Sequence, residues 1–355
     1  MAGSVNLVYI INALGVGGAE VGMCRLLDGL DENKYDVTVV VLDGGSTGVE
    51  DQIPNWVNVL RFRHSSDNLL SSGRKFVHIV RDADVIVGSL FYSAMAAKLA
   101  GSINPAATVG TWRHITSFKT QNRRAMFNLT SDLTDVILAD SEVVAETLVA
   151  ETNIDSSLIH TVPIAGIKLS DYPTITHEAT DTPVVGTVGR LTEQKNHSTI
   201  LDVAERLQDT DLRFEIAGEG ELRNQLETEI EKRELTDVNL RGFVEDVPGF
   251  LSDLDIYFQP SYHEGLCITV LEAMATSLPV VGSRTGGIRQ NVKHGKSGFL
   301  FDATDIDSFT AAIYRLGNNA KLRAEFGKAG AQVVSENFTQ AVLVSEFENA
   351  TNEIS

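Results

Sequence analysis

Short runs of apolar residues alternate along this chain with longer stretches in which apolar residues recur every three or four positions. The short runs are typical of buried strands and the longer stretches of amphipathic helices. Strands that alternate with helices form βαβ units, which assemble into parallel sheets with helices on their faces. The predicted strands span residues 6–11, 36–42, 57–62, 84–88, 108–112, 136–139, 159–162, 184–188, 213–217, 238–241, 255–259, 279–282 and 298–301.

A segment without periodicity interrupts the alternation at residues 171–183, where proline, threonine and charged residues are mixed. We expect a linker there. It divides the 355 residues into two α/β domains, residues 1–170 and 184–337, each long enough to bury its own core. Ligands of open parallel sheets bind at the carboxyl ends of the strands. Two doubly wound halves that face one another would therefore leave a central cleft lined by strand ends.

Two glutamates, Glu264 and Glu272, bracket the predicted start of a helix that follows a buried strand. Eight residues at the helical rise span about 12 Å and place both carboxylates on nearly the same side of the helix. A nucleoside diphosphate sugar has hydroxyl groups at both ends and an anionic diphosphate between them, so one carboxylate could bind each end. The backbone N–H groups of Gly265, Leu266 and Cys267 would face the diphosphate at the positive end of the helix. The alternative is a surface helix with two solvated glutamates.

The residues around the two glutamates form a wider pattern. The chain contains, in this order, Glu264-Gly265, Leu271-Glu272-Ala273-Met274-Ala275, Pro279-Val280-Val281 and Thr285-Gly286-Gly287. This pattern resembles the signature of the retaining nucleotide-sugar glycosyltransferases of family 4, which have the GT-B fold. The resemblance extends over most of the chain, through Gly15-Val16-Gly17-Gly18-Ala19-Glu20, Ala139-Asp140-Ser141-Glu142, Val188-Gly189-Arg190-Leu191, Lys195-Asn196, Ala217-Gly218-Glu219-Gly220 and Arg241-Gly242-Phe243-Val244.

The resemblance implies a GT-B fold of two Rossmann-like domains, with the acceptor on the N-terminal side and the nucleotide sugar bound by the C-terminal domain. It also implies that the C-terminal segment 338–355, with its helical pattern at 339–352, crosses back to the N-terminal domain. The implied catalytic residues are His114, Arg190, Lys195 and Glu264. The implied donor-binding residues are Gly17, Gly18, Gly242, Phe243, Gly265, Leu266, Cys267 and Glu272.

Two cations, Arg190 and Lys195, occupy the predicted loop after strand 184–188, just before a helix that begins near Asn196. Both can therefore reach a ligand at the strand ends. A diphosphate leaving group gains negative charge as the glycosidic bond breaks, and a guanidinium and an ammonium stabilise that charge. Surface ion pairing is the alternative role for the two residues.

The glycine-rich loop Gly15–Gly18 follows the first predicted strand and precedes a helix. Such a loop is also compatible with a nicotinamide dinucleotide site. The spacing is not GxGxxG, however, and the second strand ends at Asp43 and two glycines rather than in a ribose-binding context. We therefore favour the resemblance, in which the loop amides approach the diphosphate and the acceptor. A dehydrogenase would also have no use for the Glu264 and Glu272 pair.

His114 resembles the family's histidine that contacts the donor sugar, and a core or surface histidine is the alternative. The chain departs from the family pattern at Ala165, Lys168, Ser277 and Gln290, where Asn, Asp, Gly and Glu are common. Gln290 would lie near the sugar pocket, so the identity of the sugar cannot be transferred from the family.

Three Asp-x-Asp pairs raise the question of a metal, namely Asp82/Asp84, Asp253/Asp255 and Asp305/Asp307. The first two precede their strands and so lie at the amino ends of the sheets, away from the expected ligand. The third opens a helix and is typical of a helix cap. We therefore expect no metal and no cofactor besides the nucleotide sugar itself.

The net charge of −19 argues against a nucleic-acid partner, which requires a basic surface. Residues 1–170 carry only −5 of this charge and contain the clusters Arg61, Arg63, His64 and Lys119, Arg123, Arg124. An anionic or membrane-attached acceptor could meet these bases, and a mixed solvated surface is the alternative. Two isolated cysteines, no apolar run of membrane-spanning length and no signal pattern lead us to expect a cytoplasmic protein, peripheral at the inner face of the membrane where it meets a lipid-linked acceptor.

These observations predict a metal-independent, retaining hexosyltransferase that moves a sugar from a nucleoside diphosphate donor, with a UDP-sugar expected, to a glycan or lipid-linked acceptor. Synthesis of cell-surface polysaccharide or glycolipid is the expected setting. The alternative is a sugar-nucleotide-binding or epimerising protein of the same architecture, because nothing in the sequence identifies an acceptor.

Overall fold

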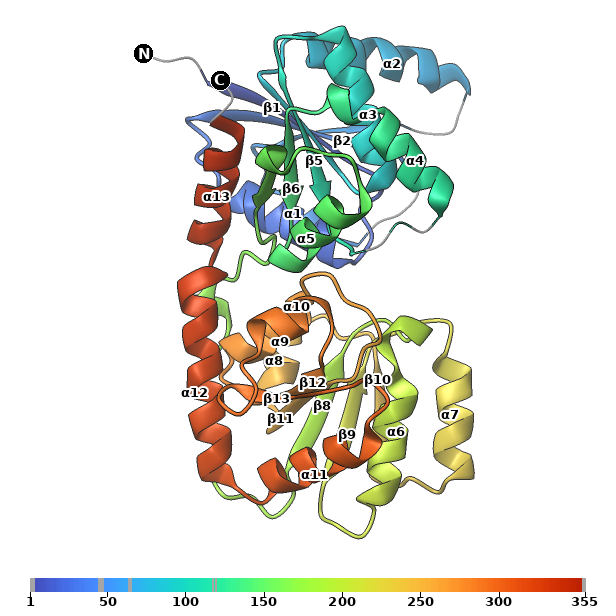
Figure 1. Ribbon diagram of the computed structural model, residues 1–355, viewed down its shortest axis with the longest axis vertical. Helices are drawn as coiled ribbons and strands as arrows, with labels where there is room; N and C mark the ends of the chain where they lie inside the picture. The colour runs from blue at the N-terminus through green and yellow to red at the C-terminus, as the bar shows by residue number, and fades with distance from the viewer. Residues whose placement is uncertain (1–3, 44–47, 63–65, 117, 119, 353–355) are drawn as a thin grey trace. The chain divides into compact units, whose positions relative to one another are not determined.

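The computed structural model describes residues 4–43, 48–62, 66–116, 118 and 120–352, and it consists of two α/β units (Figure 1). Residues 1–166 and 340–355 form the first unit, and residues 167–339 form the second. Each unit contains one sheet whose strands all run parallel. Each of the thirteen named strands lies within one residue of its predicted bounds at either end, so the predicted doubly wound α/β architecture is confirmed.

The first sheet has the order β3-β2-β1-β4-β5-β6-β7. Its strands are β1 (Val5–Ile11), β2 (Tyr35–Val41), β3 (Asn58–Arg61), β4 (Val85–Ser89), β5 (Thr108–Arg113), β6 (Val136–Ala139) and β7 (Ile159–Thr161). The helices of this unit are α1 (Gly18–Gly29), α2 (Ser66–Arg81), α3 (Phe91–Ile103), α4 (Gln121–Leu129), α5 (Glu142–Glu151) and α13 (Gln340–Asn352).

Alternate residues of the first sheet point to opposite faces, as the strand period requires. Val8 and Ile10 of β1 pack in one cluster with residues of α2 and α3. Tyr9 and Trp112 point to the other face, where the ring of Trp112 stacks on Phe347 of α13. Both faces of the sheet are therefore covered by helices, as an all-parallel sheet requires.

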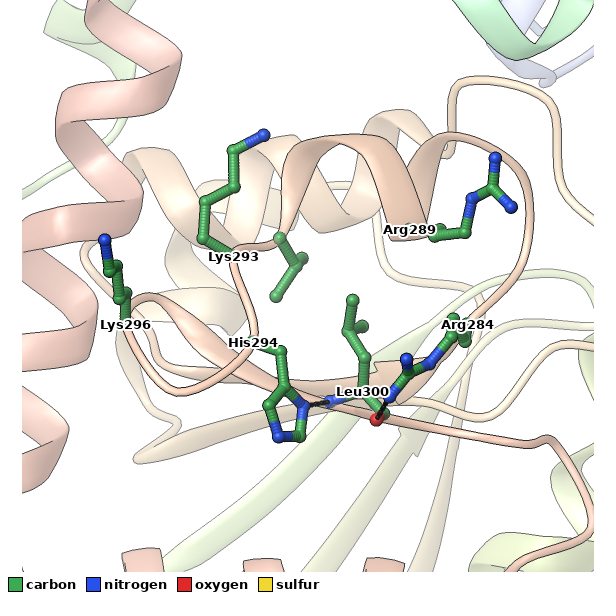
Figure 2. Close-up of a pocket in the computed structure, with 7 residues that line it drawn as sticks. Arg284, Arg289, Lys293, His294, Lys296 and Leu300 are labelled. Carbon is green, nitrogen blue, oxygen red and sulfur yellow. Dashed lines mark hydrogen bonds between the residues drawn. The ribbon is translucent and has the colours of Figure 1, made fainter.

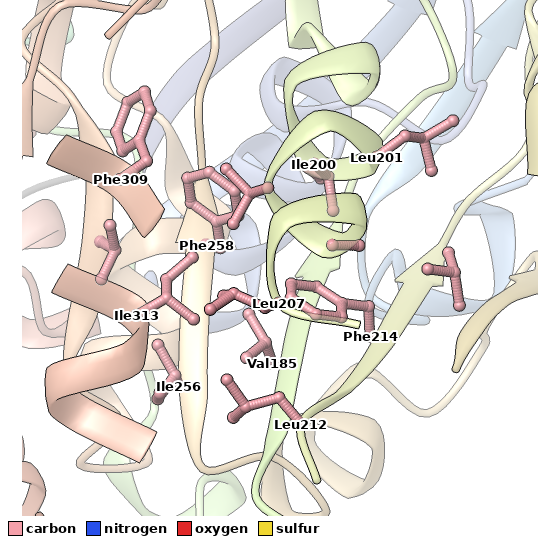
Figure 3. Packing of buried hydrophobic residues seen from close by; sticks show 14 of the residues in the cluster. Val185, Ile200, Leu201, Leu207, Leu212, Phe214, Ile256, Phe258, Phe309 and Ile313 are labelled. Atoms are coloured by element: carbon pink, nitrogen blue, oxygen red, sulfur yellow. The ribbon is translucent and has the colours of Figure 1, made fainter. Parts of the chain in front are cut away.

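The second sheet has the order β10-β9-β8-β11-β12-β13. Its strands are β8 (Val184–Val188), β9 (Arg213–Ala217), β10 (Val238–Gly242), β11 (Ile256–Gln259), β12 (Val280–Ser283) and β13 (Gly298–Phe301). The helices are α6 (His197–Arg206), α7 (Arg223–Lys232), α8 (Val247–Ser252), α9 (Ile268–Ala275), α10 (Gly286–Asn291), α11 (Ile306–Gly317) and α12 (Ala320–Asn337). Figure 3 shows the core in which Ile200 of α6 and Phe309 of α11 pack against Val185, Phe214 and Phe258 of the sheet.

The expected linker at residues 171–183 belongs to the second unit. Its backbone is held by hydrogen bonds, because the N–H of Ile175 donates to the carbonyl of Thr276. The ring of His177 lies 2.8 Å from the carbonyl of Ser277. The segment is irregular, as the sequence pattern indicated, and these two contacts pack it on the residues at the end of α9.

The C-terminal helix α13 belongs to the first unit, although it follows the second unit in the chain. Gln340 donates a hydrogen bond of 2.7 Å to the carbonyl of Arg25 in α1. A Cβ on Gly29 of α1 would lie 2.7 Å from Val344, so the two helices approach closely. Among the described residues, no helix is long and apolar enough to cross a membrane.

Candidate active site

The carboxyl ends of β8, β9, β11 and β12 bring four loops of the second unit together. Glycines allow this, since a Cβ on Gly218 would lie 1.8 Å from the carbonyl oxygen of Gly189. Gly286 has φ +45° and would clash with the carbonyl oxygen of Glu264 in the same way. The N–H of Gly287 donates to the carbonyl of Gly265 at 2.6 Å. A side chain at Gly218 would push apart the loops after β8 and β9, and one at Gly286 would push away the loop that carries Glu264.

An ion pair joins the two loops that carry the predicted catalytic residues of this unit. Nζ of Lys195, in the loop after β8, lies 2.8 Å from Oε1 of Glu264, in the loop after β11. Their side chains are only 14% and 7% exposed. Burial alone would lower the pKa of Lys195, but the charge of Glu264 outweighs it and raises the pKa above its usual range. Lys195 therefore carries a fixed positive charge at the strand ends.

Polar side chains of β11 and of the loop after it form a chain of hydrogen bonds that ends on the carboxylate of Glu264. Ser261 Oγ donates to Glu264 Oε1 at 2.7 Å and receives a hydrogen bond of 2.9 Å from Nε2 of Gln259. The hydroxyl of Tyr257 donates in turn to Oε1 of Gln259 at 3.1 Å. Alternate residues of β11 and its loop thus form a buried network that orients the carboxylate. The sequence analysis did not identify this network, although polar Gln259 at the end of an apolar strand and Ser261 just after it indicated a polar cluster there.

Glu272 is buried in α9, where its Oε1 accepts a hydrogen bond of 2.9 Å from the hydroxyl of Tyr172. Glu264 and Glu272 bracket the start of α9 at Ile268, as predicted, but Glu264 lies in the loop before the helix, so the spacing worked from the helical rise does not apply between them. Cys267 has the left-handed φ of 58° and separates the loop from the helix. Burial, followed by the charge of Glu264, raises the pKa of the Cys267 thiol to about 12, so this cysteine is a neutral packing residue.

Other predicted donor-binding residues lie at neighbouring strand ends of the same unit. Arg190 is exposed, and no described carboxylate pairs with it. Gly242 ends β10 with φ +73°, and the N–H of Gly218 donates to its carbonyl. The ring of Phe243 is 60% exposed just beyond that strand. Leu266 is buried beside Cys267. The guanidinium of Arg190 and the ring of Phe243 are thus exposed at strand ends of the same unit as the Lys195–Glu264 pair.

The first unit holds the remaining predicted residues. His114 follows β5 and lies between two partners, with Nδ1 2.7 Å from Oδ2 of Asp140 and Nε2 2.6 Å from Oγ of Ser89. Trp112 donates to the other oxygen of Asp140 at 2.8 Å. Burial raises the pKa of Asp140, against the opposing effects of His114 and Trp112. This contact set fixes the plane of the imidazole, and neither Ser89 nor Asp140 had been assigned a role from the sequence.

Gly17 and Gly18 lie at the start of α1, as predicted, with Gly17 as the N-cap residue. A Cβ on Gly17 would lie 2.5 Å from the carboxylate of Glu20, so the loop is packed tightly against the first turn of the helix. Of the two basic clusters expected in this unit, Arg63, His64 and Lys119 lie outside the described residues.

One aspartate of each Asp-x-Asp pair accepts a backbone hydrogen bond within the fold. Asp84 accepts a hydrogen bond from the N–H of Asn6, and Asp255 accepts one from the N–H of Val184. Asp305 caps α11 through the N–H of Ser308. Within the described part of the chain, no cluster of three or more His, Cys, Asp or Glu residues could hold a metal ion.

Comparison with protein families assigns both halves of the chain. Residues 16–165 match the model of Glycosyltransferase Family 4, and residues 171–333 match that of Glycosyl transferases group 1. The chain belongs to the family 4 type of glycosyltransferase.

Two curated relatives of this glycosyltransferase illustrate the similarity. The UDP-Gal:alpha-D-GlcNAc-diphosphoundecaprenol alpha-1,3-galactosyltransferase of Escherichia coli is 35% identical over 38% of this chain and 36% of its own length. The putative glycosyltransferase EpsF of Bacillus subtilis is 24% identical over 78% of each chain. The chain thus spans about a third of the first relative's length.

The fold of the glycosyltransferase also matches solved structures. The crystal structure of Anabaena Alr3699/HepE in complex with UDP-glucose aligns with a TM-score of 0.84 and 19% identity, over 98% of this chain and 99% of that one. TarM of S. aureus aligns with a TM-score of 0.79 and 13% identity, over 98% of this chain. These likenesses confirm the predicted GT-B fold.

Proposed function

We propose that this glycosyltransferase is a retaining enzyme that moves a hexose from a nucleoside diphosphate sugar, with UDP as the favoured nucleotide, to a glycan or lipid-linked acceptor. The observation that supports it most is the buried Lys195–Glu264 pair beside the exposed Arg190 at the carboxyl ends of β8 and β11. This arrangement provides positive charge for a diphosphate and a carboxylate for sugar hydroxyls at one point.

The cations act on the leaving group. As the bond between the anomeric carbon and the diphosphate oxygen breaks, negative charge grows on that oxygen. Arg190 and Lys195 stabilise this charge, and each such group usually contributes about 10²-fold or more to the rate. Lys195 is well suited because its pKa is raised by Glu264, so it keeps its proton throughout the reaction.

The two carboxylates orient the donor. Glu264, held by Ser261, binds hydroxyls of the sugar, and Glu272, held by Tyr172, binds hydroxyls of the ribose. The acceptor oxygen attacks the anomeric carbon from the side that the diphosphate leaves, and the departing diphosphate oxygen accepts the acceptor proton. The configuration of the donor is thereby retained. His114, oriented by Asp140 and Ser89, keeps the role that the family resemblance implies, a contact with the donor sugar.

No metal enters this proposal, because one aspartate of each Asp-x-Asp pair is engaged in a backbone hydrogen bond or a helix cap. UDP is favoured because the Anabaena structure named above contains UDP-glucose and the E. coli relative uses UDP-Gal. The same relative's name specifies a diphosphoundecaprenol-linked acceptor, which supports lipid-linked glycan or cell-surface polysaccharide synthesis.

Peripheral contact with the inner face of a membrane is part of the proposal. On the first unit, the side chains of Leu99 and Leu129 are 66% and 86% exposed. α3 and the end of α4 lie together, because Nζ of Lys98 contacts Oγ1 of Thr130 at 3.1 Å. Arg123 lies on α4 as well. Exposed leucines and a basic side chain on the same pair of helices are typical of a surface that binds anionic lipid.

Product analysis tests the proposed activity. The enzyme is incubated with UDP-glucose, UDP-galactose or UDP-N-acetylglucosamine and with a glycan-diphosphate-lipid acceptor, and the products are separated by mass. We expect one acceptor–sugar adduct and free UDP. Conversion of the donor into an epimer without acceptor, or binding of UDP with no turnover of any donor, would support the sugar-nucleotide-binding or epimerising alternative instead.

A further inference from the structure

A basic pocket of about 700 Å³ lies in the second unit, at the outer edge of its sheet (Figure 2). It is lined by Arg284, Arg289, Val292, Lys293, His294, Lys296 and Leu300. These residues come from the end of β12, from α10 and the turn that follows it, and from the edge strand β13. Figure 2 shows the two arginines at one end of the pocket and the two lysines at the other, with Leu300 between them.

The charge of the basic pocket is unusual for this chain. The protein has a net charge of −19, yet residues 273–301 contain no Asp or Glu. Arg284, Arg289, Lys293 and Lys296 are all exposed, and none of them pairs with a carboxylate among the described residues. Four cations line one cavity whose lining includes no carboxylate. They repel one another, and an anion in the cavity removes that repulsion.

Two residues of the basic pocket also cover the free edge of the sheet. Arg284 donates to the carbonyl of Leu300 at 2.9 Å, and the N–H of Leu300 donates to Nδ1 of His294 at 3.0 Å. His294 is therefore a hydrogen-bond acceptor on that side and is not counted as a cation. The edge of β13 is closed to a further strand, and the cavity is left for a small ligand.

The basic pocket is distinct from the candidate active site. The first residues of α10 contact the loop of Glu264, since the N–H of Gly287 donates to Gly265. Arg289 lies in the last turn of α10, and Lys293 and Lys296 follow that helix. Arg289 thus lies near the end of α10 that is remote from the active-site loop, and Lys293 and Lys296 lie beyond that end. Arg284 lies two residues before α10, at the end of that helix near the active-site loop, so the test variants change only the other cations.

We propose that the basic pocket is a second anion site, which binds a phosphorylated ligand with an apolar part. Arginine forks and lysine ammonium groups are the usual partners of phosphate oxygens. Val292 and Leu300 supply apolar surface between the cations. The shared chemistry is a phosphate oxyanion, carried either by an anionic lipid headgroup or by a soluble phosphorylated compound. The proposal does not rest on the proposed transferase activity.

Calorimetry with inorganic tripolyphosphate tests the site, at 150 mM salt to suppress weak surface attraction. The variant is Lys293→Glu/Lys296→Glu, and the control with the same charge change is Lys232→Glu/Lys321→Glu, at two exposed lysines of α7 and α12. We expect the first variant to lower the affinity about tenfold or more, since hydrogen bonds to charged groups usually contribute that much. The control should bind like the wild type. Equal losses in both variants, or no binding to the wild type, would overturn the proposal.

The active site is separated from the basic pocket by the variant Lys195→Ala. Binding that survives in this variant but not in Lys293→Glu/Lys296→Glu belongs to the basic pocket. Binding that is lost only in Lys195→Ala belongs to the diphosphate site and contradicts the proposal. Circular dichroism checks that each variant is folded, and Arg289→Gln/Lys293→Gln replaces the charge reversal if that variant unfolds.

Vesicles then distinguish the two sources of phosphate. Sedimentation with vesicles of 30% phosphatidylglycerol in phosphatidylcholine is measured in a Leu99→Glu/Leu129→Glu background, which removes the apolar surface of the first unit. Retention that requires Lys293 and Lys296 would identify a lipid headgroup as the ligand. Tripolyphosphate binding without such retention would identify a soluble phosphorylated compound. If neither probe depends on the two lysines, the pocket is not an anion site.

Discussion

Removal of Lys195 should harm both stability and activity, through two separate effects. The side chain is 14% exposed and its ammonium lies 2.8 Å from the carboxylate of Glu264, which is 7% exposed. In the Lys195→Met variant, the carboxylate of Glu264 keeps its hydrogen bond from Ser261 but loses Lys195, its only ion-pair partner among the described residues. Loss of one partner of a buried pair usually costs about 3–5 kcal/mol, and partial exposure places this pair near the lower end, at about 3 kcal/mol.

A double-mutant cycle measures this magnitude in urea, in the absence of nucleotide. We expect Lys195→Met to lower the free energy of unfolding by about 3 kcal/mol, and Lys195→Met/Glu264→Gln to lower it by less than the two single variants together. Lys232→Met is the control, because among the described residues that exposed lysine pairs only with Glu229 on its own helix, and it should change stability by no more than about 0.5 kcal/mol.

The second effect is catalytic and does not recover in the double variant. Because Lys195 is proposed to stabilise the leaving diphosphate, both Lys195→Met and Lys195→Met/Glu264→Gln should lose about 10²-fold or more in kcat. A Lys195→Met variant as stable as the wild type would show that the ion pair contributes nothing to the ligand-free fold. A stable variant with wild-type kcat would refute the assignment of Lys195 to the leaving group.

Three further predictions concern Glu272, Ser277 and His197. Glu272→Gln should weaken UDP binding about tenfold in calorimetry, because an amide accepts weaker hydrogen bonds from ribose hydroxyls, and unchanged affinity would remove Glu272 from the ribose site. Ser277 has φ +65°, so Ser277→Gly should raise the free energy of unfolding by about 0.5–1 kcal/mol in urea, and a loss would show that this backbone is unstrained. Burial, followed by the charge of Lys195, lowers the pKa of His197 to about 4. In the unfolded chain His197 binds a proton near pH 6.5, whereas in the folded chain it binds one only near pH 4. The free energy of unfolding should therefore fall by about 3 kcal/mol as the pH drops from about 6.5 to 4, and His197→Leu should remove that fall. An unchanged pH profile in the variant would show that other groups cause the fall.

Most strands were predictable because they are short apolar runs, such as the buried residues 136–139, and their alternation with helices requires parallel sheets. The first residue of α9 was not predictable, because the left-handed residue before it is Cys267, a type that does not mark such a conformation. The bond from Tyr172 to Glu272 joins residues 100 positions apart and has no local signal. For the same reason the contacts of the segment 171–183 were not predictable, since its partners Thr276 and Ser277 lie about a hundred residues further on.

The site was predictable to the extent that a motif identifies residues at strand ends. Arg190, Lys195 and Glu264 lie on loops whose positions follow from the parallel topology. Their supporting contacts depend on side-chain packing that local sequence does not encode, as for Asp140 and Ser89 around His114. The basic pocket had a visible signal, the absence of acidic residues from 273 to 301, but only the fold shows that these cations share one cavity.

The anomeric configuration of the product, measured by NMR in a reaction run with excess chelator, tests the central claim most directly. An α-linked UDP-sugar should give an α-linked product at an undiminished rate. A β-linked product would contradict the retaining mechanism, and activity that disappears with chelator and returns with Mg²⁺ or Mn²⁺ would contradict metal-independent transfer through Arg190 and Lys195.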